Sequence, residues 1–252
     1  MGKSRPADER QKEIFNMISQ VGTVYVSKLS KKFNVTQETI RKDLDTLEKE
    51  GMVLRTHGGA VLNHKAPVQR HISNVDIKSM IAHEAASLVE KGDIIALDSS
   101  DFSLQLAKEL KLMEITIITN SISIMLELLN QENIQLITIG GYVNLQNYSF
   151  IGAMAEKSVE NYYVNKYFLS CSGFDLTHGV FEKHEGEAQV KKKFLDVAKE
   201  VILMTDHTHY NQKSLTSLMS LSDVSKLIID SKLPIQHLAA LKSMGIDVQV
   251  PQ

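Results

Sequence analysis

Cysteine is nearly absent from this chain of 252 residues, which contains a single one, Cys171. One cysteine excludes a disulfide within the chain and any zinc site built on several cysteine ligands of one copy. Because Cys171 ends the apolar run at residues 167–171, we expect a small buried thiol. A reactive nucleophile is the alternative.

Long hydrophobic runs are missing as well. No stretch approaches the roughly 20 consecutive apolar residues that a membrane helix requires. Residues 1–6 lead directly into polar sequence and lack the apolar core of a secretory signal peptide. We therefore expect a cytoplasmic protein with no membrane partner.

Length and charge distribution indicate two domains with different partners. A chain of this length accommodates one domain of about 60 residues and one of about 180. Residues 1–65 carry 12 Lys and Arg against 8 Asp and Glu, whereas the rest of the chain carries 16 against 22. A basic small domain joined to an acidic large one indicates that the first part approaches a polyanion.

Local patterns in residues 1–62 predict a small helical domain that ends in a β-hairpin. A helix is expected over residues 7–20, followed by an extended piece at 24–26. Ser27 can cap a second, short helix, and Asn34 suits the left-handed position that closes it. Thr36 opens a third helix that runs to about Glu50.

Two short extended runs, residues 52–56 and 60–62, flank a Gly-Gly turn and predict the hairpin. Three helices with a tight turn between the second and third, followed by a hairpin, form a winged helix-turn-helix. Residues 63–75 are polar, contain Pro67 and lack the hydrophobic periodicity of a helix or a strand, so we interpret them as a linker.

The third helix has the composition of a recognition helix. Packing Ile40, Leu44 and Leu47 inward turns the intervening polar residues outward, where they can supply donors, acceptors and cations to a duplex. Gln37 could pair with adenine, and Arg41 or Lys42 with guanine or phosphate. A solvated face of a protein-interaction module is the alternative. The candidate DNA-binding residues are Lys28, Lys31, Lys32, Thr36, Gln37, Glu38, Thr39, Arg41, Lys42, Arg55, His57 and Gly58.

From residue 76 to residue 252, helical periods alternate with short apolar runs, which predicts a doubly wound, mostly parallel α/β sheet. We expect strands at residues 94–97, 115–119, 134–139, 166–171, 201–204, 227–229 and 248–250. We expect helices at residues 76–90, 103–111, 121–131, 153–161, 187–199 and 234–243.

The N-terminal motif resembles the signature of the DeoR family of bacterial transcriptional regulators. The resemblance rests on residues 36–44, Leu47-Glu48, Gly51 and residues 55–60. It implies that Thr36, Thr39, Arg41 and Lys42 contact double-stranded operator DNA and that His57-Gly58-Gly59 forms the wing tip. The family usually has two arginines where this chain has Arg41-Lys42, so the second contact is expected to be a point-charge contact to phosphate.

The resemblance continues through the larger domain, which is similar to sugar-phosphate isomerases of the ribose-5-phosphate type. It implies a regulator, expected to be a repressor of carbohydrate genes, that is released from its operator by a small molecule such as a phosphorylated sugar. Since ligands of open parallel sheets bind beyond the carboxyl ends of the strands, we place the effector there. The candidate effector-binding residues are Asp98, Ser99, Ser100, Asp101, Phe102, Asn120, Ser121, Gly140, Gly141, Gly173, Asp175, Glu187, Lys191, Asp206, His209 and Lys213.

Among these residues we expect Lys191 and Lys213 to be the phosphate cations and Asp98, Asp175 and Glu187 to accept hydrogen bonds from hydroxyl groups. The helices that follow Ser99-Ser100 and Asn120-Ser121 can hold an anion at their N-terminal amides.

This chain departs from the family pattern in two loops that would bind the phosphate group of a sugar phosphate. The first loop, usually Asp-Ser-Gly-Thr-Thr, has Ser100-Asp101-Phe102 in its last three positions, and a carboxylate there opposes an anion. His209 stands where a lysine is usual. A less anionic or differently shaped ligand is therefore the alternative to a sugar phosphate.

Other function classes stay open at this stage. His207 and His209 alternate after a strand, and a metal site there is the alternative to ordinary loop histidines. An isomerase that uses Asp98, Glu187 and Lys191 is the rival to a regulator. We expect no catalytic residue, metal or cofactor, and a homo-oligomer, either a dimer or a tetramer, that spaces paired DNA-binding domains on two half-sites.

Overall fold

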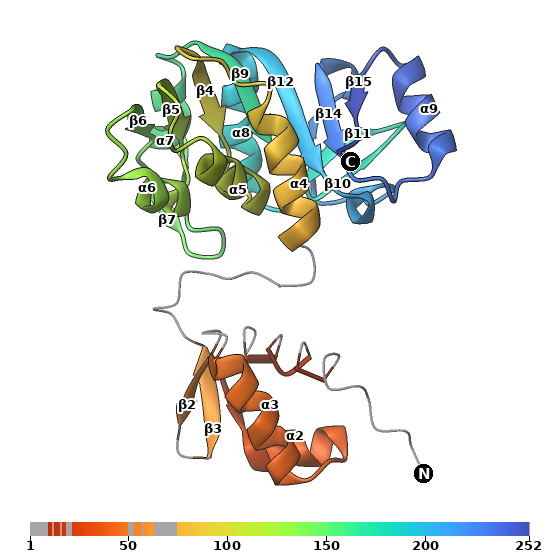
Figure 1. The fold of residues 1–252 in the computed structure, drawn as a ribbon. Coiled ribbons are helices and arrows are strands. Elements are labelled where there is room, and N and C mark those ends of the chain that lie inside the picture. Colours follow the sequence, from red (N-terminus) through yellow and green to blue (C-terminus); the bar gives the residue numbers. More distant parts are fainter. Residues whose placement is uncertain are drawn as a thin grey trace. The chain divides into compact units, whose positions relative to one another are not determined.

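The computed structural model describes residues 10, 11, 13–15, 17, 18, 22–49, 53–56, 58–62 and 75–251. The chain divides into two compact units, Met1–Ile72 and Ser73–Gln252, each with its own core (Figure 1).

The N-terminal unit has the predicted winged helix-turn-helix elements. The described residues between 10 and 18 are helical, within the helix expected over 7–20. The three strands form an antiparallel sheet in the order β1-β3-β2. The elements are β1 (Thr23–Tyr25), α2 (Val26–Phe33), α3 (Gln37–Lys49), β2 (Val53–Thr56) and β3 (Gly59–Leu62).

Apolar side chains at helical spacing build one core in this unit. Ile40, Leu44 and Leu47 of α3 are buried, as predicted, against Ile14 and Leu29 from the two preceding helices. Their burial fixes which side of α3 faces solvent.

The C-terminal end of α2 agrees with the prediction, and the N-terminal end does not. Asn34 is left-handed, with φ 53°, and its N–H donates to Ser30, so it closes α2 as expected. The expected cap at Ser27 is wrong, because α2 begins at Val26 directly after β1 and Tyr25 occupies the cap position without a side-chain hydrogen bond. The helix therefore begins two residues earlier than a cap at Ser27 implies, and its first residue, Val26, is buried.

Gly59 is required by a close backbone approach beside the wing. A Cβ at this position would lie 2.0 Å from the carbonyl oxygen of Val24, on the strand that pairs with β3. The second glycine of the Gly-Gly turn therefore allows β1 to join the hairpin.

The larger unit contains a seven-stranded sheet with every neighbouring pair parallel, in the order β15-β14-β12-β9-β4-β5-β6. The order reverses between β4 and β9, which makes the sheet doubly wound, as predicted. Each of the seven expected strands is present: β4 (Ile94–Leu97), β5 (Ile115–Thr119), β6 (Ile134–Thr138), β9 (Val164–Leu169), β12 (Ala198–Thr205), β14 (Lys226–Ile229) and β15 (Asp247–Gln249).

Helices cover both faces of this sheet. Ile95 and Phe168 pack in a cluster with α4, α5 and α6, whereas Ala96 and Tyr167 pack in a second cluster with α7, α8 and α9. In Figure 1, α4 and α5 lie in front of the sheet and α8 lies behind it. The helices are α4 (Val75–Ala86), α5 (Asp101–Glu109), α6 (Ile122–Leu128), α7 (Ala153–Val159), α8 (Glu185–Val197) and α9 (Ile235–Ser243).

Five further strands were not predicted. Tyr142–Asn144 (β7) and Ser149–Ile151 (β8) form a hairpin, and a small antiparallel sheet has the order β10-β11-β13. These strands are three or four residues long, too short to show a period. The sheet consists of β10 (Gly173–Asp175), β11 (Gly179–Glu182) and β13 (Thr216–Met219), and short 3-10 turns occupy His207–His209 (η2) and Leu221–Asp223 (η3).

No helix in the described ranges combines the length and the apolar character needed to cross a bilayer.

A buried ion pair links the first helix to α3. Arg10 donates to Asp43 from Nε (2.6 Å) and from Nη2 (3.0 Å), and both side chains are less than a tenth exposed. Gln11 adds a third donor to the same carboxylate (3.0 Å). This pair supplements the apolar contacts that hold α3 in place.

We expect Asp43→Ala to destabilise the N-terminal unit by about 3–5 kcal/mol, because the change leaves the buried Arg10 guanidinium without its carboxylate. Amide hydrogen exchange of α3, measured in the full chain, reports the loss locally. Glu38→Ala removes a carboxylate from the exposed side of the same helix and serves as the control. Equal protection of α3 in both variants would mean that the Arg10–Asp43 pair does not hold the helix.

Candidate functional site

The exposed side of α3 carries the predicted DNA-reading residues. Oγ1 of Thr36 accepts the N–H of Thr39 at 3.1 Å, so Thr36 caps the helix as predicted. Gln37, Glu38, Arg41 and Lys42 are exposed and Thr39 is half-buried. The predicted orientation of the helix is therefore confirmed, and its first turns present amide, carboxylate and cationic groups to solvent.

Arg55 lies against α3 instead of projecting from the wing. Its guanidinium donates to the Asp45 carboxylate and to the carbonyl oxygen of Arg41 (3.3 Å). Its backbone N–H donates to Glu48 at 2.8 Å. The base of the wing is thereby tied to the recognition helix. Gly58 is exposed with φ 96°, and His57 lies outside the described residues.

The three predicted lysines of α2 are exposed. Lys28 lies over the Tyr25 ring at 5.6 Å, and Lys32 pairs with Glu13 at 3.2 Å. Together with Lys31 they add positive charge beside α3, which suits phosphate contacts.

In the sensor unit, a buried ion network occupies the switch point of the sheet. Lys191 of α8 pairs with Asp98, which follows β4 (3.1 Å), and with Glu182 at the end of β11 (2.7 Å). It also donates to the carbonyl oxygen of Ser170, which follows β9 (2.8 Å). Glu182 was not predicted, because its role depends on the small sheet that the sequence did not reveal.

The charges in this network stabilise one another. Burial by itself raises the pKa of the Glu182 carboxyl, but the charge and hydrogen bond of Lys191, with hydrogen bonds from Ser172 and Lys183, lower it to about 2. Burial lowers the pKa of Lys191, and the charges of Asp98 and Glu182 more than compensate, raising it above its ordinary value. Glu182 and Lys191 are therefore both charged at neutral pH.

Asp98 is held by several donors in addition to Lys191. Oδ1 accepts from the N–H and hydroxyl of Ser100 (3.1 and 2.6 Å) and from the hydroxyl of Ser103 (2.6 Å), and Oδ2 accepts the N–H of Ser170 (2.9 Å).

Glu187 joins four segments at the same edge of the sheet. Its Oε2 accepts from Ser99 (3.0 Å) and Asn120 (3.4 Å), which follow β4 and β5. Its Oε1 accepts from Asn144 of β7 (3.0 Å) and from Ser149 of β8. The sequence predicted Glu187, Ser99 and Asn120 for this edge but missed the two hairpin residues.

Tyr167 lies in the interior beside these carboxylates. Its hydroxyl is fully buried and has no hydrogen-bond partner among the described residues. Burial, then the charges of Asp98, Glu187 and Glu182, raise its pKa well above the ordinary value. The hydroxyl of Tyr167 therefore stays protonated at neutral pH.

The structure brings together Asp98, Ser99, Ser100, Asn120, Glu187 and Lys191, and the other predicted effector residues have different partners. Phe102 is buried in the apolar core beneath α5, and Asp101 pairs with Lys78 at 2.7 Å. Ser100 and Ser121 act as caps, accepting the N–H of Ser103 and of Ile124, respectively.

Two of the three predicted glycines and the outer loops make contacts within the protein. A Cβ on Gly141 or Gly173 would meet backbone oxygen of Ile151 (2.6 Å) or Gln212 (2.3 Å), whereas one on Gly140 would meet open space. The remaining predicted residues form a separate set of carboxylate pairs: Asp206 with His209 (3.1 Å), Asp175 with His178 (3.1 Å), and Asp175 with Lys213 (3.9 Å).

The two histidines after β12 have different partners. His207 pairs with Asp230 at 2.7 Å and His209 with Asp206 at 3.1 Å. Burial raises the pKa of Asp206, but hydrogen bonds from His209 and Thr208 outweigh it and lower the pKa below its usual value. In the part of the chain that the structure describes, no group of three or more His, Cys, Asp or Glu side chains is arranged to bind a metal.

Cys171 is buried, as expected, and burial raises the pKa of its thiol to about 12. It is therefore protonated at neutral pH, which opposes a nucleophilic role.

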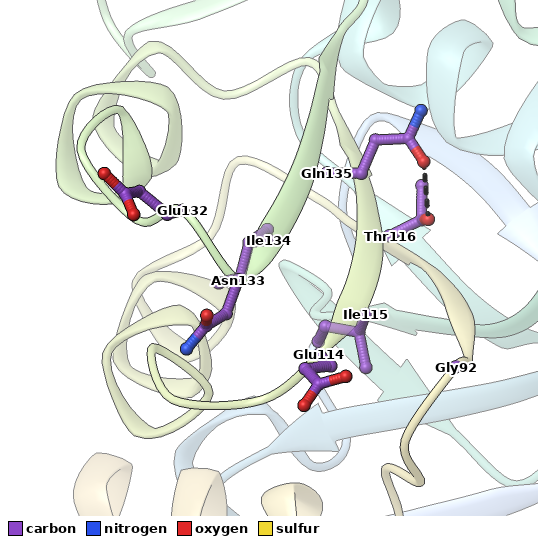
Figure 2. Close-up of a pocket in the computed structure, with 8 residues that line it drawn as sticks. All are labelled: Gly92, Glu114, Ile115, Thr116, Glu132, Asn133, Ile134 and Gln135. Atoms are coloured by element: carbon purple, nitrogen blue, oxygen red, sulfur yellow. Dashed lines mark hydrogen bonds between the residues drawn. The ribbon is translucent and has the colours of Figure 1, made fainter.

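A pocket of about 340 Å³ lies at the opposite edge of the sheet (Figure 2). It is lined by Gly92 before β4 and by residues that begin β5 and β6, including Thr116 and Gln135, which share a hydrogen bond of 3.3 Å. Glu114 and Glu132 supply its charge. Since ligands of parallel sheets bind at the carboxyl ends, this pocket is not the candidate effector site.

We expect Lys191→Met to destabilise the sensor unit by about 3–5 kcal/mol, because two buried carboxylates lose their cation. Denaturant titration of the full chain measures the effect. Lys193→Met, on the exposed side of the same helix, removes only the surface pair with Glu160 and is the control. If both variants unfold at the same denaturant concentration, the buried network does not contribute to stability.

Low pH should reduce the folding stability of the sensor unit, because the Glu182 carboxylate becomes protonated. Its folded pKa of about 2 lies below the unfolded value of about 4.3. The stabilisation is therefore complete above that unfolded value and is lost as the pH falls through about 2. The difference in melting temperature between the parent and Glu182→Gln should narrow progressively from pH 5 to pH 2. A constant difference over this range would contradict the assignment.

Comparison with known proteins agrees with this architecture. The family described as "DeoR-like helix-turn-helix domain" matches residues 10–66, and the "DeoR C terminal sensor domain" matches residues 73–231. The chain is 42% identical over 245 residues to an uncharacterized HTH-type transcriptional regulator, YulB, of Bacillus subtilis, covering 95% of each protein. It is 30% identical over 231 residues to the L-fucose operon activator of Haemophilus influenzae, covering 89% of this chain and 92% of that protein.

Among solved structures, ribose 5-phosphate isomerase A from Methanocaldococcus jannaschii superposes with a TM-score of 0.41 and 21% identity over 55% of each chain. The names of both relatives describe regulators of transcription. With both family domains present in order along the sequence, the chain belongs to the DeoR family of DNA-binding transcriptional regulators.

Proposed function

We propose that α3 enters the major groove of operator DNA and that its first two turns read the base edges. The observation that carries this proposal is the exposed polar side of α3 on a helix anchored by three buried apolar residues and the Asp43 carboxylate. The proposed contacts are Lys28, Lys31, Lys32, Thr36, Gln37, Glu38, Thr39, Arg41, Lys42, His57 and Gly58, with Arg55 included as the residue that fixes the wing on α3.

Arg41 and Lys42 have different proposed roles. Arg41 is a fork of donors suited to guanine, and its present partner, Glu38 at 3.5 Å, is an exposed side chain that it can leave at little cost. Lys42 carries a compact charge suited to phosphate. The preference for one DNA sequence over another should therefore depend on Arg41, and the salt-dependent part of the DNA affinity should depend on Lys42.

We expect Arg41→Ala to weaken binding to the preferred operator by about 1–3 kcal/mol and to reduce discrimination between sequences. Genomic fragments enriched by the parent protein provide the operator for a binding titration. Lys42→Ala should weaken binding to all sequences alike and reduce the salt slope by about one. Lys49→Ala, an exposed cation in the last turn of α3, is the control. Unchanged operator protection by Arg41→Ala would refute the assignment.

The sensor unit is proposed to bind a sugar-class metabolite at the carboxyl ends of β4, β5 and β9. Asp98, Ser99, Asn120, Glu187 and Lys191 meet there, at the switch point where ligands of doubly wound sheets bind. The L-fucose operon activator carries a sugar operon in its name, which supports control of carbohydrate genes by this chain. We propose that the chain is a repressor, and that the protein assembles as a dimer or tetramer that pairs DNA-binding units on two half-sites.

For the effector site to control DNA binding, the ligand must bind more tightly to the state of the protein that has the weaker operator affinity. A ligand shifts an equilibrium between two states only by the difference in its affinity for them. A ligand at 100 times its dissociation constant should raise the free energy of unfolding by about 2.7 kcal/mol. We expect the same ligand to lower operator affinity in a titration of the full chain. A ligand that stabilises the chain and leaves operator affinity unchanged would contradict the proposed coupling, and tighter operator binding would favour an activator.

A further inference from the structure

The longest stretch of the chain without a charged side chain covers residues 133–155 and includes the β7–β8 hairpin. Four apolar side chains in this stretch, those of Tyr142, Val143, Leu145 and Met154, are each more than half exposed. Three of them lie in or directly after β7. A group of exposed apolar side chains is typical of a surface that binds another protein.

The outer edge of β7 carries main-chain groups that the hairpin leaves open. Phe150 of β8 directs its N–H away from β7 and donates it to Asn120 at 2.8 Å. Val143 lies opposite Phe150. Two opposite residues of an antiparallel pair either exchange both hydrogen bonds or point them away from each other, so the N–H and C=O of Val143 point away from β8. Among the described residues, no other segment bonds to these two groups.

The hairpin is held in place from its other edge and from its inner face. Ile122, at the start of α6, donates to the carbonyl oxygen of Tyr148, just before β8, at 2.8 Å. On the inner face, the buried Asn144 donates to Glu187 at 3.0 Å. The hairpin is thus fixed to the sensor unit, and the edge of β7 remains open to a partner. An exposed strand edge pairs readily with a strand of another chain.

The absence of charge favours a second copy of this chain as that partner. At a two-fold axis each residue meets its own counterpart, so a charged side chain there would face a like charge. Residues 66–252 carry 22 Asp and Glu against 16 Lys and Arg, and two copies of the sensor unit therefore repel each other except where charge is missing. A neutral surface offers nothing to the phosphates of a nucleic acid.

We propose that β7 pairs with β7 of a second copy across a two-fold axis at Val143. The two hairpins then form one four-stranded antiparallel sheet, in which the N–H and C=O of Val143 bond to the same groups of the second copy. This inference rests on the proposed homo-oligomer and specifies its contact surface. Because Asn144 of the same strand bonds to Glu187, the contact surface is joined directly to the candidate effector site.

Cysteine cross-linking of the full chain tests this pairing. Opposite residues of a hydrogen-bonded antiparallel pair have Cα atoms about 5.5 Å apart, a separation that a disulfide can bridge. We expect Val143→Cys to form a covalent dimer under mild oxidation roughly tenfold faster or more than Leu112→Cys. Leu112 is exposed and lies outside the hairpin. The native Cys171 is buried and does not compete.

A charge at the proposed axis tests the pairing without a covalent bond. We expect Val143→Lys to halve the native mass measured by light scattering, because the two lysines face each other across the axis. Leu112→Lys makes a comparable change at an exposed apolar residue and should keep the mass of the parent. Val143→Ile should also keep it, since a β-branched apolar side chain suits the strand.

The outcomes separate this inference from the proposed homo-oligomer. An oligomeric parent whose Val143→Cys variant cross-links no faster than Leu112→Cys would overturn the pairing through β7 and leave the homo-oligomer standing. An unchanged mass for Val143→Lys would have the same meaning. A parent chain that is monomeric at micromolar concentration would overturn both the homo-oligomer and the proposed contact.

Discussion

The sensor unit depends on a cation that is buried between two carboxylates. Taking Lys191, Asp98 and Glu182 out of water is costly, and the cost is recovered only when all three are paired and fully hydrogen-bonded. Those contacts fix α8 against the segments that follow β4 and β9 and against the last residue of β11. The carboxyl edge of the sheet therefore has a defined geometry before any ligand arrives, which is what a selective binding site requires.

The DNA-binding unit uses the same kind of interaction on a smaller scale. A unit of this size buries little apolar surface, and the bidentate Arg10–Asp43 pair gives α3 an additional, directional attachment to the first helix. Holding α3 from its inner side leaves Gln37, Arg41 and Lys42 free to face a duplex. In both units, then, buried charges fix the elements that carry the proposed binding residues.

The sequence predicted the regular elements better than the site. Runs such as Ile94–Leu97 and Ile115–Thr119 are apolar on both faces, and this is the pattern of strands covered by helices on both sides. The strands β7, β8 and β11, which are three or four residues long, carry no comparable pattern. Glu182, Asn144 and Ser149 were missed for this reason, because only those short strands bring them to Glu187 and Lys191. Asp43 was missed as a buried ion-pair partner because Arg10 lies 33 residues away.

A structure of the full chain bound to an operator fragment tests the central claim most directly. The account predicts that α3 lies in the major groove, with Arg41 bonded to a base edge and Lys42 beside a phosphate, while Arg10 and Asp43 remain paired on the side away from the DNA. A complex in which α3 faces solvent and the duplex contacts another surface would contradict it.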